Sequence, residues 1–372
     1  MDSTRDTERF DTVVIGGGQA GLAIGYHLAN RGRQFVILDA NDRIGDPWRT
    51  RWDSLRLFTP ARLNGLPGWP FPAAAWSFPT KDEMADYLEA YAARFGLPVR
   101  TGVAAERFGR DAGRFEVVAG ARRYEANNVV VATGGFQSPR LPTFATELDP
   151  DIMQLHSSQY RRPAQLQPGD VLVVGAANSG ADIALELSHT RQIWLSGRHP
   201  GSEPVRPGSV WDRLVTPPLW FAASRLLTVR MWAGRKLRST VLSSGHPLAR
   251  VKPKDLETAG VRRLPKTVGV QNGLPLVEDG RTLDVANVIW CTGFQPDFGW
   301  IDLSVFDDDG QPLHDRGVVS AEPGLYFLGL PFLFALTSSL VGGVGRDAEH
   351  IAEHIACRTA TATSMIKTVA NR

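Results

Sequence analysis

A glycine-rich turn between a short apolar strand and a helix occurs twice in this chain, and this repeat constrains the fold more than any other feature. The first copy begins with Thr12-Val13-Val14-Ile15, which predicts a buried parallel strand, and continues into Gly16-Gly17-Gly18-Gln19-Ala20-Gly21. A helical pattern follows over residues 22–30, and a second apolar strand over 35–38 ends at Asp39. This order predicts a βαβ unit that binds a dinucleotide.

Each glycine of the first turn has a separate physical task in that prediction. Gly16 permits the tight turn, Gly18 lets a pyrophosphate approach the backbone, and Gly21 lets the helix pack closely against its strand. The amino end of the helix then stabilises the anion. Asp39 can accept hydrogen bonds from both hydroxyls of an adenosine ribose. A glycine turn without a ligand is the alternative, and the complete order of strand, turn, helix, strand and acid argues against it.

The second copy differs at the positions that select the cofactor. A strand over 171–174 leads into Gly175-Ala176-Ala177-Asn178-Ser179-Gly180, so Ala177 replaces the middle glycine. After a helix from 181 and a strand over 192–195, the chain reads Ser196-Gly197-Arg198, without an acidic residue. A carboxylate there would repel a 2′-phosphate, whereas an arginine beside a hydroxyl would bind one. This copy therefore predicts NADPH rather than NADH, and an arginine that only faces solvent is the alternative.

Two further apolar strands end in a threonine and a glycine, at Ala132-Thr133-Gly134 and at Cys291-Thr292-Gly293. Such turns let the backbone pass close to a bound dinucleotide. Two dinucleotide sites in one chain imply a tightly held flavin and an exchanging nicotinamide cofactor. The expected fold class is α/β, with two Rossmann-like dinucleotide-binding domains, one for FAD and one for NADPH, the second inserted in the first.

The remaining segments are assigned to these two domains. Residues 1–165 and 285–372 are expected to form a discontinuous FAD-binding domain, and residues 166–284 an NADPH-binding domain with a helical insertion at 204–263. The insertion and the tryptophan- and proline-rich segment 46–79 are the loops expected to form the substrate pocket. Further helices are expected over 81–95 and 346–358, and strands over 99–103, 129–131, 288–290 and 324–329, with a β-ribbon over 108–124.

Composition narrows the function classes. The formal net charge is +2, from 41 basic and 39 acidic residues, which argues against a nucleic-acid-binding protein. Cys291 and Cys357 lack C-x-x-C spacing, so neither disulphide exchange nor a metal site is expected.

The sequence also carries no targeting signal of the usual kinds. The amino terminus has no apolar segment typical of a signal peptide. The apolar stretch 214–224 contains two prolines and is far shorter than the roughly 20 residues of a membrane-spanning helix. A cytoplasmic protein without a transmembrane segment is expected, and a homo-oligomer is left open.

The two glycine turns and the two threonine–glycine strand ends follow one another along the chain in an order that resembles the class B flavoprotein monooxygenases. These include flavin-containing monooxygenases, plant YUCCA enzymes and Baeyer–Villiger monooxygenases. The resemblance covers residues 11–355. The family's histidine motif is matched at His156 and at the aromatic Tyr160, while Pro150 and Ile152 replace its phenylalanine and glycine. Tyr160 in place of tryptophan is closer to the flavin-containing monooxygenases. The segments Cys291-Thr292-Gly293-Phe294-Gln295-Pro296-Asp297 and Gly345-Arg346-Asp347 are similar to the second strand end and the C-terminal flavin-contacting helix of the family.

The segment 53–60 resembles the small bacterial and YUCCA-like branch. Amine-oxidising members carry an asparagine near Phe58 or Thr59, and this chain has none there, with Asn64 the nearest. An amine substrate is therefore not carried over from the resemblance.

The resemblance implies that NADPH reduces FAD by hydride transfer, and that reduced flavin and O₂ give a C4a-(hydro)peroxyflavin shielded by NADP⁺. One oxygen atom is then inserted into a small organic substrate by N-, S- or carbonyl oxygenation. His156 and Tyr160 are expected on the linker in a structural or gating role. The expected FAD contacts are Gly16, Gly18, Gln19, Ala20, Gly21, Asp39, Ala40, Trp48, Arg49, Thr59, Val103, Ala132, Thr133 and Gly134. The expected NADPH contacts are Gly175, Ala177, Asn178, Ser179, Gly180, Ser196, Arg198, Thr292 and Gly293.

Several alternatives stay open. The chain could be an NADPH-dependent flavin reductase or oxidase without oxygenation, or a cofactor-bound sensor without turnover. His156 could be an ordinary structural histidine, and Trp48 and Trp52 could fill the core. The basic segment from Arg225 to Arg238 could be a solvated helix over a substrate channel, or could bind a membrane surface or a partner.

Overall fold

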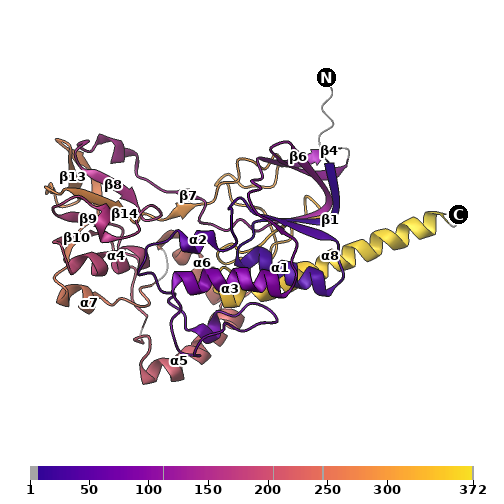
Figure 1. Cartoon of the computed structure of the whole chain (residues 1–372), viewed down its shortest axis with the longest axis horizontal. Coiled ribbons are helices and arrows are strands. Elements are labelled where there is room, and N and C mark those ends of the chain that lie inside the picture. The colour runs from indigo at the N-terminus through magenta and orange to yellow at the C-terminus, as the bar shows by residue number, and fades with distance from the viewer. Residues whose placement is uncertain (1–6, 112, 204, 245–246, 371–372) are drawn as a thin grey trace.

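The computed structural model describes residues 7–111, 113–203, 205–244 and 247–370, with backbone only for 239–244 and 359–370. Figure 1 shows two lobes, each built around its own sheet, with β7 (Ser138–Pro139) lying between them. The fold is therefore α/β with two sheet-centred modules, which confirms the expected class.

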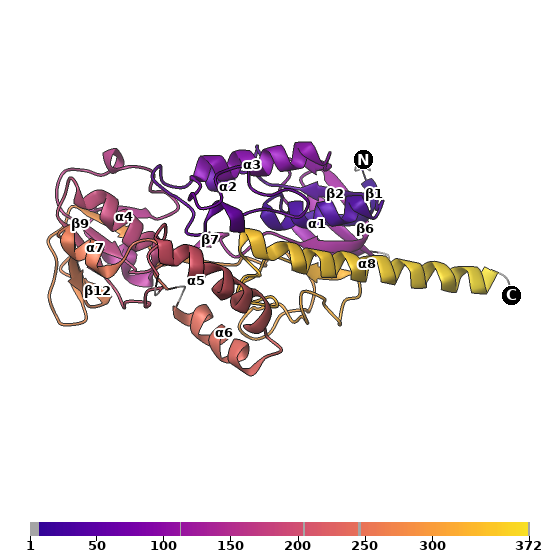
Figure 2. The same ribbon diagram turned by 90° about the horizontal axis from the view of Figure 1, so that it is seen from below.

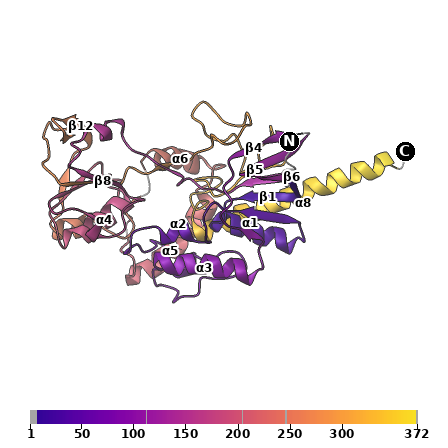
Figure 3. The ribbon, with the colours of Figure 1, turned by 45° about the horizontal axis from the view of Figure 1, so that its top comes forward.

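The first sheet has β1 and β6 at its centre, parallel to each other along most of their length. The apolar ends of both strands are fully buried, which explains the unbroken valine and isoleucine runs. β2 and β3 extend the parallel part, while β5 and β4 form an antiparallel ribbon beyond β6; Figure 3 shows this side of the sheet. The strands are β1 (Thr7–Ile15), β2 (Phe35–Leu38), β3 (Val99–Arg100), β4 (Arg107–Asp111), β5 (Arg114–Ala119), β6 (Arg122–Val131) and β16 (Leu325–Phe327), which also pairs with β6. The helices of this lobe are α1 (Gln19–Asn30), α2 (Asp46–Arg49), α3 (Lys81–Arg94), α8 (Val341–Ala370) and the short η1 (Ala61–Leu63).

The second sheet is entirely parallel and has the order β11-β10-β9-β14-β8. The strands are β8 (Met153–His156), β9 (Val171–Val174), β10 (Ile193–Ser196), β11 (Arg262–Leu264) and β14 (Asn287–Trp290). The helices of this lobe are α4 (Asn178–Ser188) and α7 (Pro253–Thr258), with short turns η2 (Thr143–Glu147) and η3 (Pro163–Gln165). Between β10 and β11 the chain also forms α5 (Val210–Phe221), the π-turn η4 (Ala222–Leu226) and α6 (Trp232–Ser244). A hairpin of β12 (Thr267–Gln271) and β13 (Leu274–Val277) follows β11.

Several element boundaries differ from those expected. The ribbon over 108–124 and the strand over 129–131 share one continuous strand, β6, because Arg122–Val131 pairs with β5 on one side and β1 on the other. The last helix begins at Val341 and continues to Ala370, beyond the expected 346–358. β8 and β14 belong to the second sheet, although their residues fell inside the ranges 1–165 and 285–372. We propose that the second domain extends from β8 to β14.

A two-stranded ribbon joins the lobes. β7 (Ser138–Pro139), a few residues after the end of β6, pairs antiparallel with β15 (Phe294–Gln295), which follows the end of β14. Because both strands lead into this ribbon from their carboxyl ends, the carboxyl edges of the two sheets meet there. Ligands of open parallel sheets bind at that edge.

The helical insertion lies outside both sheets. Figure 2 shows α5 and α6 on one side of the molecule, next to the start of α8. Arg346 on α8 donates to the Ser224 carbonyl, and Val229 N donates to the Phe334 carbonyl at 2.8 Å. The insertion is thus attached to the first lobe, although it follows β10 of the second sheet.

Candidate functional site

The two glycine turns have matching backbones. Gly16 and Gly175 both have φ of 109°, in the region that favours glycine. Gly16 N donates to the Leu38 carbonyl at 2.7 Å, and Gly175 N donates to the Ser196 carbonyl at 2.9 Å. Each turn is therefore closed against the second strand of its own βαβ unit, as the sequence predicts.

The helices that follow these turns begin without a side-chain cap. Gly18 is the N-cap of α1 and Ala177 the N-cap of α4, and neither has a capping side chain. In contrast, Thr80 caps α3 and Ser209 caps α5. The amide donors and the positive end of the dipole at the starts of α1 and α4 suit an anion, which is what a pyrophosphate provides.

The space at the first turn fits a flavin dinucleotide. A Cβ added at Gly18 would meet nothing within 4 Å, and the same holds at Gly134, where β6 ends. Thr133 Oγ1 is buried and has no hydrogen-bond partner in the described part of the chain. By contrast, a Cβ on Gly21 would overlap the Gly16 carbonyl oxygen, so Gly21 allows the helix to pack and Gly18 leaves room for a ligand.

Asp39 lies against the first turn. Its carboxylate accepts hydrogen bonds from Gly17 N at 2.6 Å and from the backbone and side-chain nitrogens of Asn41 at 2.8 and 2.7 Å. The residue is only 5% exposed. These bonds fix the carboxylate beside the glycine turn, and its contact with a ribose stays a prediction.

Arg49 and Thr59, expected at FAD, make contacts within the protein. The Arg49 guanidinium lies 3.0–3.2 Å from carboxylate oxygens of Asp46, Asp86 and Glu89, and so ties α2 to α3. Thr59 Oγ1 donates to Asn64 Oδ1 at 2.6 Å, and the Asn64 amide returns a bond to the Thr59 carbonyl. Asn64, whose role the sequence left open, is a buried brace of this loop.

The other residues expected at FAD differ in burial. Ala20 is buried, Gln19, Trp48 and Val103 are half-buried, and Ala40 is exposed. Trp48 packs against the core of the first lobe. Trp52 is 3% exposed and packs in the core of the second lobe instead. The tryptophans of this loop therefore reach both lobes.

At the end of β10, only one of the two residues expected at the 2′-phosphate is exposed. Ser196 is fully buried, and its hydroxyl bonds to the Pro265 carbonyl and to Thr267, each at 2.8 Å. Arg198 is exposed and makes no hydrogen bond or ion pair with the residues that the structure describes. Arg263 lies beside it, because its guanidinium donates to the Gly197 carbonyl at 2.8 Å. No sequence pattern pointed to Arg263, whose place depends on β11 pairing with β10.

The second turn is braced by a neighbouring loop. Asn178 Nδ2 donates to the Pro247 carbonyl, and Asn178 Oδ1 accepts from Ala249 N, both at 3.0 Å. The Asn178 side chain thus holds the residues after α6. A Cβ on Gly180 would overlap the Gly175 carbonyl oxygen, as at Gly21 in the first turn. Ser179, next in the first turn of α4, is half-buried.

His156 joins the two strand ends at the lobe junction. Its Nε2 lies 3.0 Å from the Gly293 carbonyl oxygen, and its Nδ1 faces Ser158 N at 3.1 Å and Ser158 Oγ at 2.8 Å. Since a carbonyl only accepts, Nε2 carries the proton and Nδ1 accepts. Burial lowers the pKa of His156, so the ring is neutral. Thr292 donates to the Arg140 carbonyl next to this contact.

Tyr160, the second linker residue, is fully buried in the core of the second lobe. Its hydroxyl donates to Glu186 on α4 at 2.6 Å, and burial raises the pKa of the phenol, so the proton stays on it. These contacts attach the linker to the helix that begins at the second glycine turn.

Arg51 is a residue of this junction that sequence reasoning missed. Its guanidinium carbon lies 5.0 Å from the centre of the Phe294 ring and 5.9 Å from that of Phe136. Burial and the nearby Arg161 lower the pKa of Arg51, and no carboxylate pairs with it in the described chain. A cation without a counter-charge at the meeting point of two dinucleotide edges attracts an anionic group.

The C-terminal motif lies at the base of the insertion. Asp347 is fully buried, 3.5 Å from Arg316, and burial raises the pKa of its carboxyl. The Arg346 guanidinium lies over the Phe334 ring at 5.2 Å. The side chains of this motif are therefore engaged with residues 224, 316 and 334, and a flavin contact through the helix end stays a prediction.

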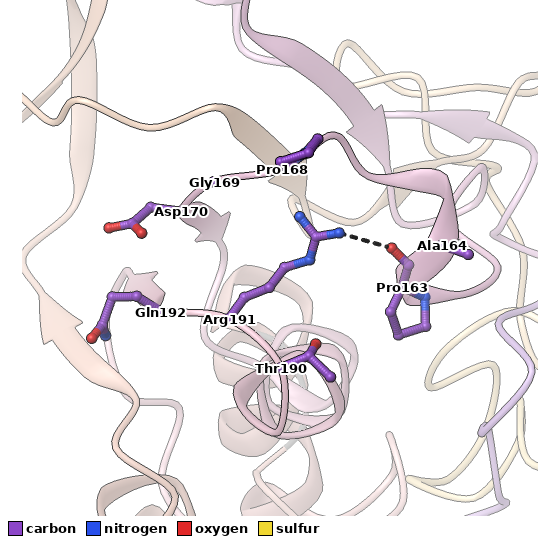
Figure 4. A pocket seen from close by; sticks show the side chains of 8 residues that line it. All are labelled: Pro163, Ala164, Pro168, Gly169, Asp170, Thr190, Arg191 and Gln192. Carbon is purple, nitrogen blue, oxygen red and sulfur yellow. Dashed lines mark hydrogen bonds between the residues drawn. The ribbon is translucent and has the colours of Figure 1, made fainter.

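Two other features lie apart from this chemistry. Neither Cys291 nor Cys357 forms a disulphide within the described residues, and burial raises the pKa of Cys291 to about 12, so it is not a thiolate. An open hollow of about 580 Å³, shown in Figure 4, lies at the amino ends of β9 and β10, on the edge opposite the glycine turns. Arg191 crosses it and donates to the Pro163 and Leu166 carbonyls, at 3.4 and 3.0 Å.

Among the helices that the structure describes, none combines the length and the apolar character that a membrane span needs.

Comparisons with known proteins agree with this geometry. A family model described as pyridine nucleotide-disulphide oxidoreductase matches residues 13–206. An uncharacterized CzcO-like oxidoreductase of Geobacillus kaustophilus (strain HTA426) is 41% identical over 347 residues, which cover 93% of this chain and 98% of that protein. The indole-3-pyruvate monooxygenase YUCCA1 of Oryza sativa subsp. japonica is 37% identical over 196 residues, 50% of this chain and 48% of that protein. The solved structure of a flavin-containing monooxygenase from Stenotrophomonas maltophilia has a TM-score of 0.76 and 29% identity, covering 95% of this chain and 99% of that one.

The likeness to the CzcO-like protein covers 93% of this chain, and the family model spans the first turn, the linker and the second turn. The chain therefore belongs to the pyridine nucleotide-disulphide oxidoreductase family and, within it, to the class B flavoprotein monooxygenases, which depend on FAD and NADPH.

Proposed function

We propose that the first glycine turn holds FAD, that the second holds NADPH, and that the protein transfers one oxygen atom of O₂ to a small organic substrate between the two lobes. The observation that carries this proposal is the β7–β15 ribbon, into which the carboxyl ends of β6 and β14 both lead. Two dinucleotides at those edges would face one another, as hydride transfer between them requires.

The chain's own residues bind, orient and shield. The uncapped starts of α1 and α4 offer amides to two pyrophosphates, and Gly18 leaves the space that such a group needs. Asp39, held beside the first turn, would accept hydrogen bonds from a ribose, and Arg198, with Arg263 beside it, would bind a 2′-phosphate. When bound, the flavin supplies the oxygenation chemistry, for which no catalytic side chain is needed.

The linker fastens the strand ends and the first helix of the second lobe to one another. His156 bonds the Gly293 carbonyl while its own strand, β8, lies beside β14, and Tyr160 fastens the same linker to α4. Neutral His156 has its only N–H committed to this bond, so it positions the backbone and does not exchange protons with the substrate. Arg51, which has no carboxylate partner among the described residues, supplies positive charge beside Phe294, and we propose that it faces the pyrophosphate of NADPH.

Oxygen transfer and simple NADPH oxidation are separated by following the oxygen atoms. The holoprotein is given NADPH and ¹⁸O₂ with indole-3-pyruvate, on which the rice relative acts by its name, and separately with a thioether and a cyclic ketone. A product that contains ¹⁸O, with a matching fall in H₂O₂ release, supports the monooxygenase. Stoichiometric H₂O₂ with every substrate supports the reductase or oxidase alternative. A flavin that anaerobic NADPH fails to bleach supports a sensor without turnover.

A further inference from the structure

The helical insertion exposes an unusual concentration of large apolar side chains. Thirteen such side chains are exposed in the part of the chain that the structure describes, and eight of them lie between Val210 and Trp232. Val210, Trp211 and Trp232 are at least 70% exposed, and Leu214 and Phe221 at least 60%. Scattered exposed leucines are normal in proteins, but a concentration of this kind marks a surface that another partner covers.

Helix α5 is turned with its apolar side outward. Trp211, Leu214, Pro218 and Phe221 follow one another at helical spacing of three and four residues, and all are exposed. Asp212, on the opposite side, is buried and accepts hydrogen bonds from Gly208 N and the Thr216 hydroxyl. A helix that packed its apolar stripe on the protein would bury these apolar side chains and expose Asp212.

The same surface is strongly basic. Residues 210–238 contain six arginines and lysines, and their one acidic residue is the buried Asp212. Arg213, Arg225 and Arg235 are exposed, and Lys236 lies 5.6 Å from the ring of Trp232 on α6. Exposed tryptophan, leucine and phenylalanine bordered by arginine and lysine are the composition of helices that lie in the surface of an anionic bilayer.

The insertion presents this surface from a fixed position. Leu336 N donates to the Leu227 carbonyl at 3.1 Å, and Trp220 lies against Gly342 at the start of α8. Figure 2 shows α5 and α6 together on one side of the molecule. These contacts fix the insertion against the rest of the protein, so its exposed apolar side chains project into solvent from a fixed position.

We propose that the outward face of residues 210–238, the insertion face, docks this protein on the surface of an anionic phospholipid bilayer without crossing it. The charge decides between a bilayer and a second copy of the chain. A two-fold dimer through the insertion face would bring its basic residues against the same basic residues, which is unfavourable, whereas anionic headgroups complement them.

The test is sedimentation of the FAD-loaded full chain with vesicles of phosphatidylcholine containing roughly one quarter phosphatidylglycerol, compared with pure phosphatidylcholine. We expect binding to the anionic vesicles that weakens with salt. Arg225→Glu with Arg235→Glu should lower the partition coefficient at least about 25-fold, at about fivefold for each basic residue. Trp211→Ser with Phe221→Ser should abolish binding while flavin content and melting temperature stay unchanged, because both side chains are exposed.

The matched controls lie on the sheets. Arg114→Glu with Arg122→Glu changes the same charge on β5 and β6, and Val268→Ser removes an exposed valine from β12; neither should alter sedimentation. Three outcomes would overturn the proposal: no binding to anionic vesicles, equal and salt-insensitive binding to both vesicle types, or a solution dimer that Trp211→Ser with Phe221→Ser converts to a monomer.

Discussion

Gly18 and Ala177 have nearly the same backbone conformation, with φ and ψ of −77° and −168° at Gly18 and of −81° and −171° at Ala177. Each is the N-cap of the helix that follows a glycine turn. Because any residue can adopt this extended conformation, the backbone does not require glycine at position 18. We therefore propose that the absent side chain at Gly18 serves close approach of a ligand, and that the methyl group of Ala177 would narrow the equivalent space in the second turn.

Gly18→Ala and Gly21→Ala should separate ligand space from helix packing. A Cβ at Gly18 meets nothing within 4 Å, so this variant should fold with an unchanged apo melting temperature but bind FAD at least about tenfold more weakly. A Cβ at Gly21 overlaps the Gly16 carbonyl, so that variant should lose stability whether or not FAD is present. Flavin titration and thermal melts of both apoproteins distinguish the two. Normal FAD affinity in Gly18→Ala would contradict the proposal that Gly18 provides space for the ligand.

Arg198→Ala should discriminate between the two nicotinamide cofactors. We propose that the exposed guanidinium binds the 2′-phosphate, which NADH lacks, so KM for NADPH should rise about tenfold or more and KM for NADH should stay the same. Steady-state flavin reduction with both cofactors provides the measurement. Arg281→Ala, which removes an exposed arginine paired with its neighbour Asp279, is the control. Equal effects on the two cofactors would show that Arg198 does not read the 2′-phosphate.

Arg51→Met should weaken both cofactors alike. The side chain lies beside Phe294 and has no carboxylate partner in the described chain, and the pyrophosphate that we propose it faces is common to NADPH and NADH. We expect both KM values to rise about five- to tenfold. Arg51→Lys, which keeps the charge, should recover part of the loss. An unchanged KM for both cofactors in Arg51→Met would rule out this role.

His156 should make stability depend on pH. Its folded pKa is lowered from 6.5, so the unfolded state binds more protons as pH falls. The contribution of His156 to the free energy of unfolding is fully present above pH 6.5, and it is lost as the pH falls through the lowered pKa of the folded state. Burial also lowers the pKa values of His27, His314 and His350, so His156→Gln should give a shallower decline of melting temperature below pH 6.5, not a flat one. Parallel pH profiles for the two proteins would contradict the neutral assignment.

Tyr160→Phe should test whether the linker tyrosine is structural or gates the cofactor. Loss of its hydrogen bond to Glu186 should cost about 1 kcal/mol of unfolding free energy, measured by denaturant titration. If Tyr160 only fastens the linker, the rate of flavin reduction by saturating NADPH should be unchanged. A large change in that rate with little change in stability would favour gating.

The sequence was sufficient to predict the local structure wherever a few neighbouring residues determine the backbone geometry. Both βαβ units, both glycine turns and the position of Asp39 beside the first turn depend on steric limits and hydrogen bonds within about 30 residues. The resemblance to the flavoprotein monooxygenases was confirmed for the same reason, since its motifs lie in these turns and strand ends. The burial of Ser196 could not be predicted, because its hydroxyl is used by Pro265 and Thr267 after a long excursion of the chain.

Tertiary structure alone decided which segments far apart in the chain meet. The bond from His156 to Gly293, the place of Arg263 beside Gly197 and the pairing of β7 with β15 each join residues far apart in sequence. The same applies to the insertion, whose composition was visible in the sequence but whose apolar side turned outward only because Asp212 and Trp220 face the body. A local pattern fixes which face of a helix is apolar, whereas the direction in which that face points depends on every segment that packs around it.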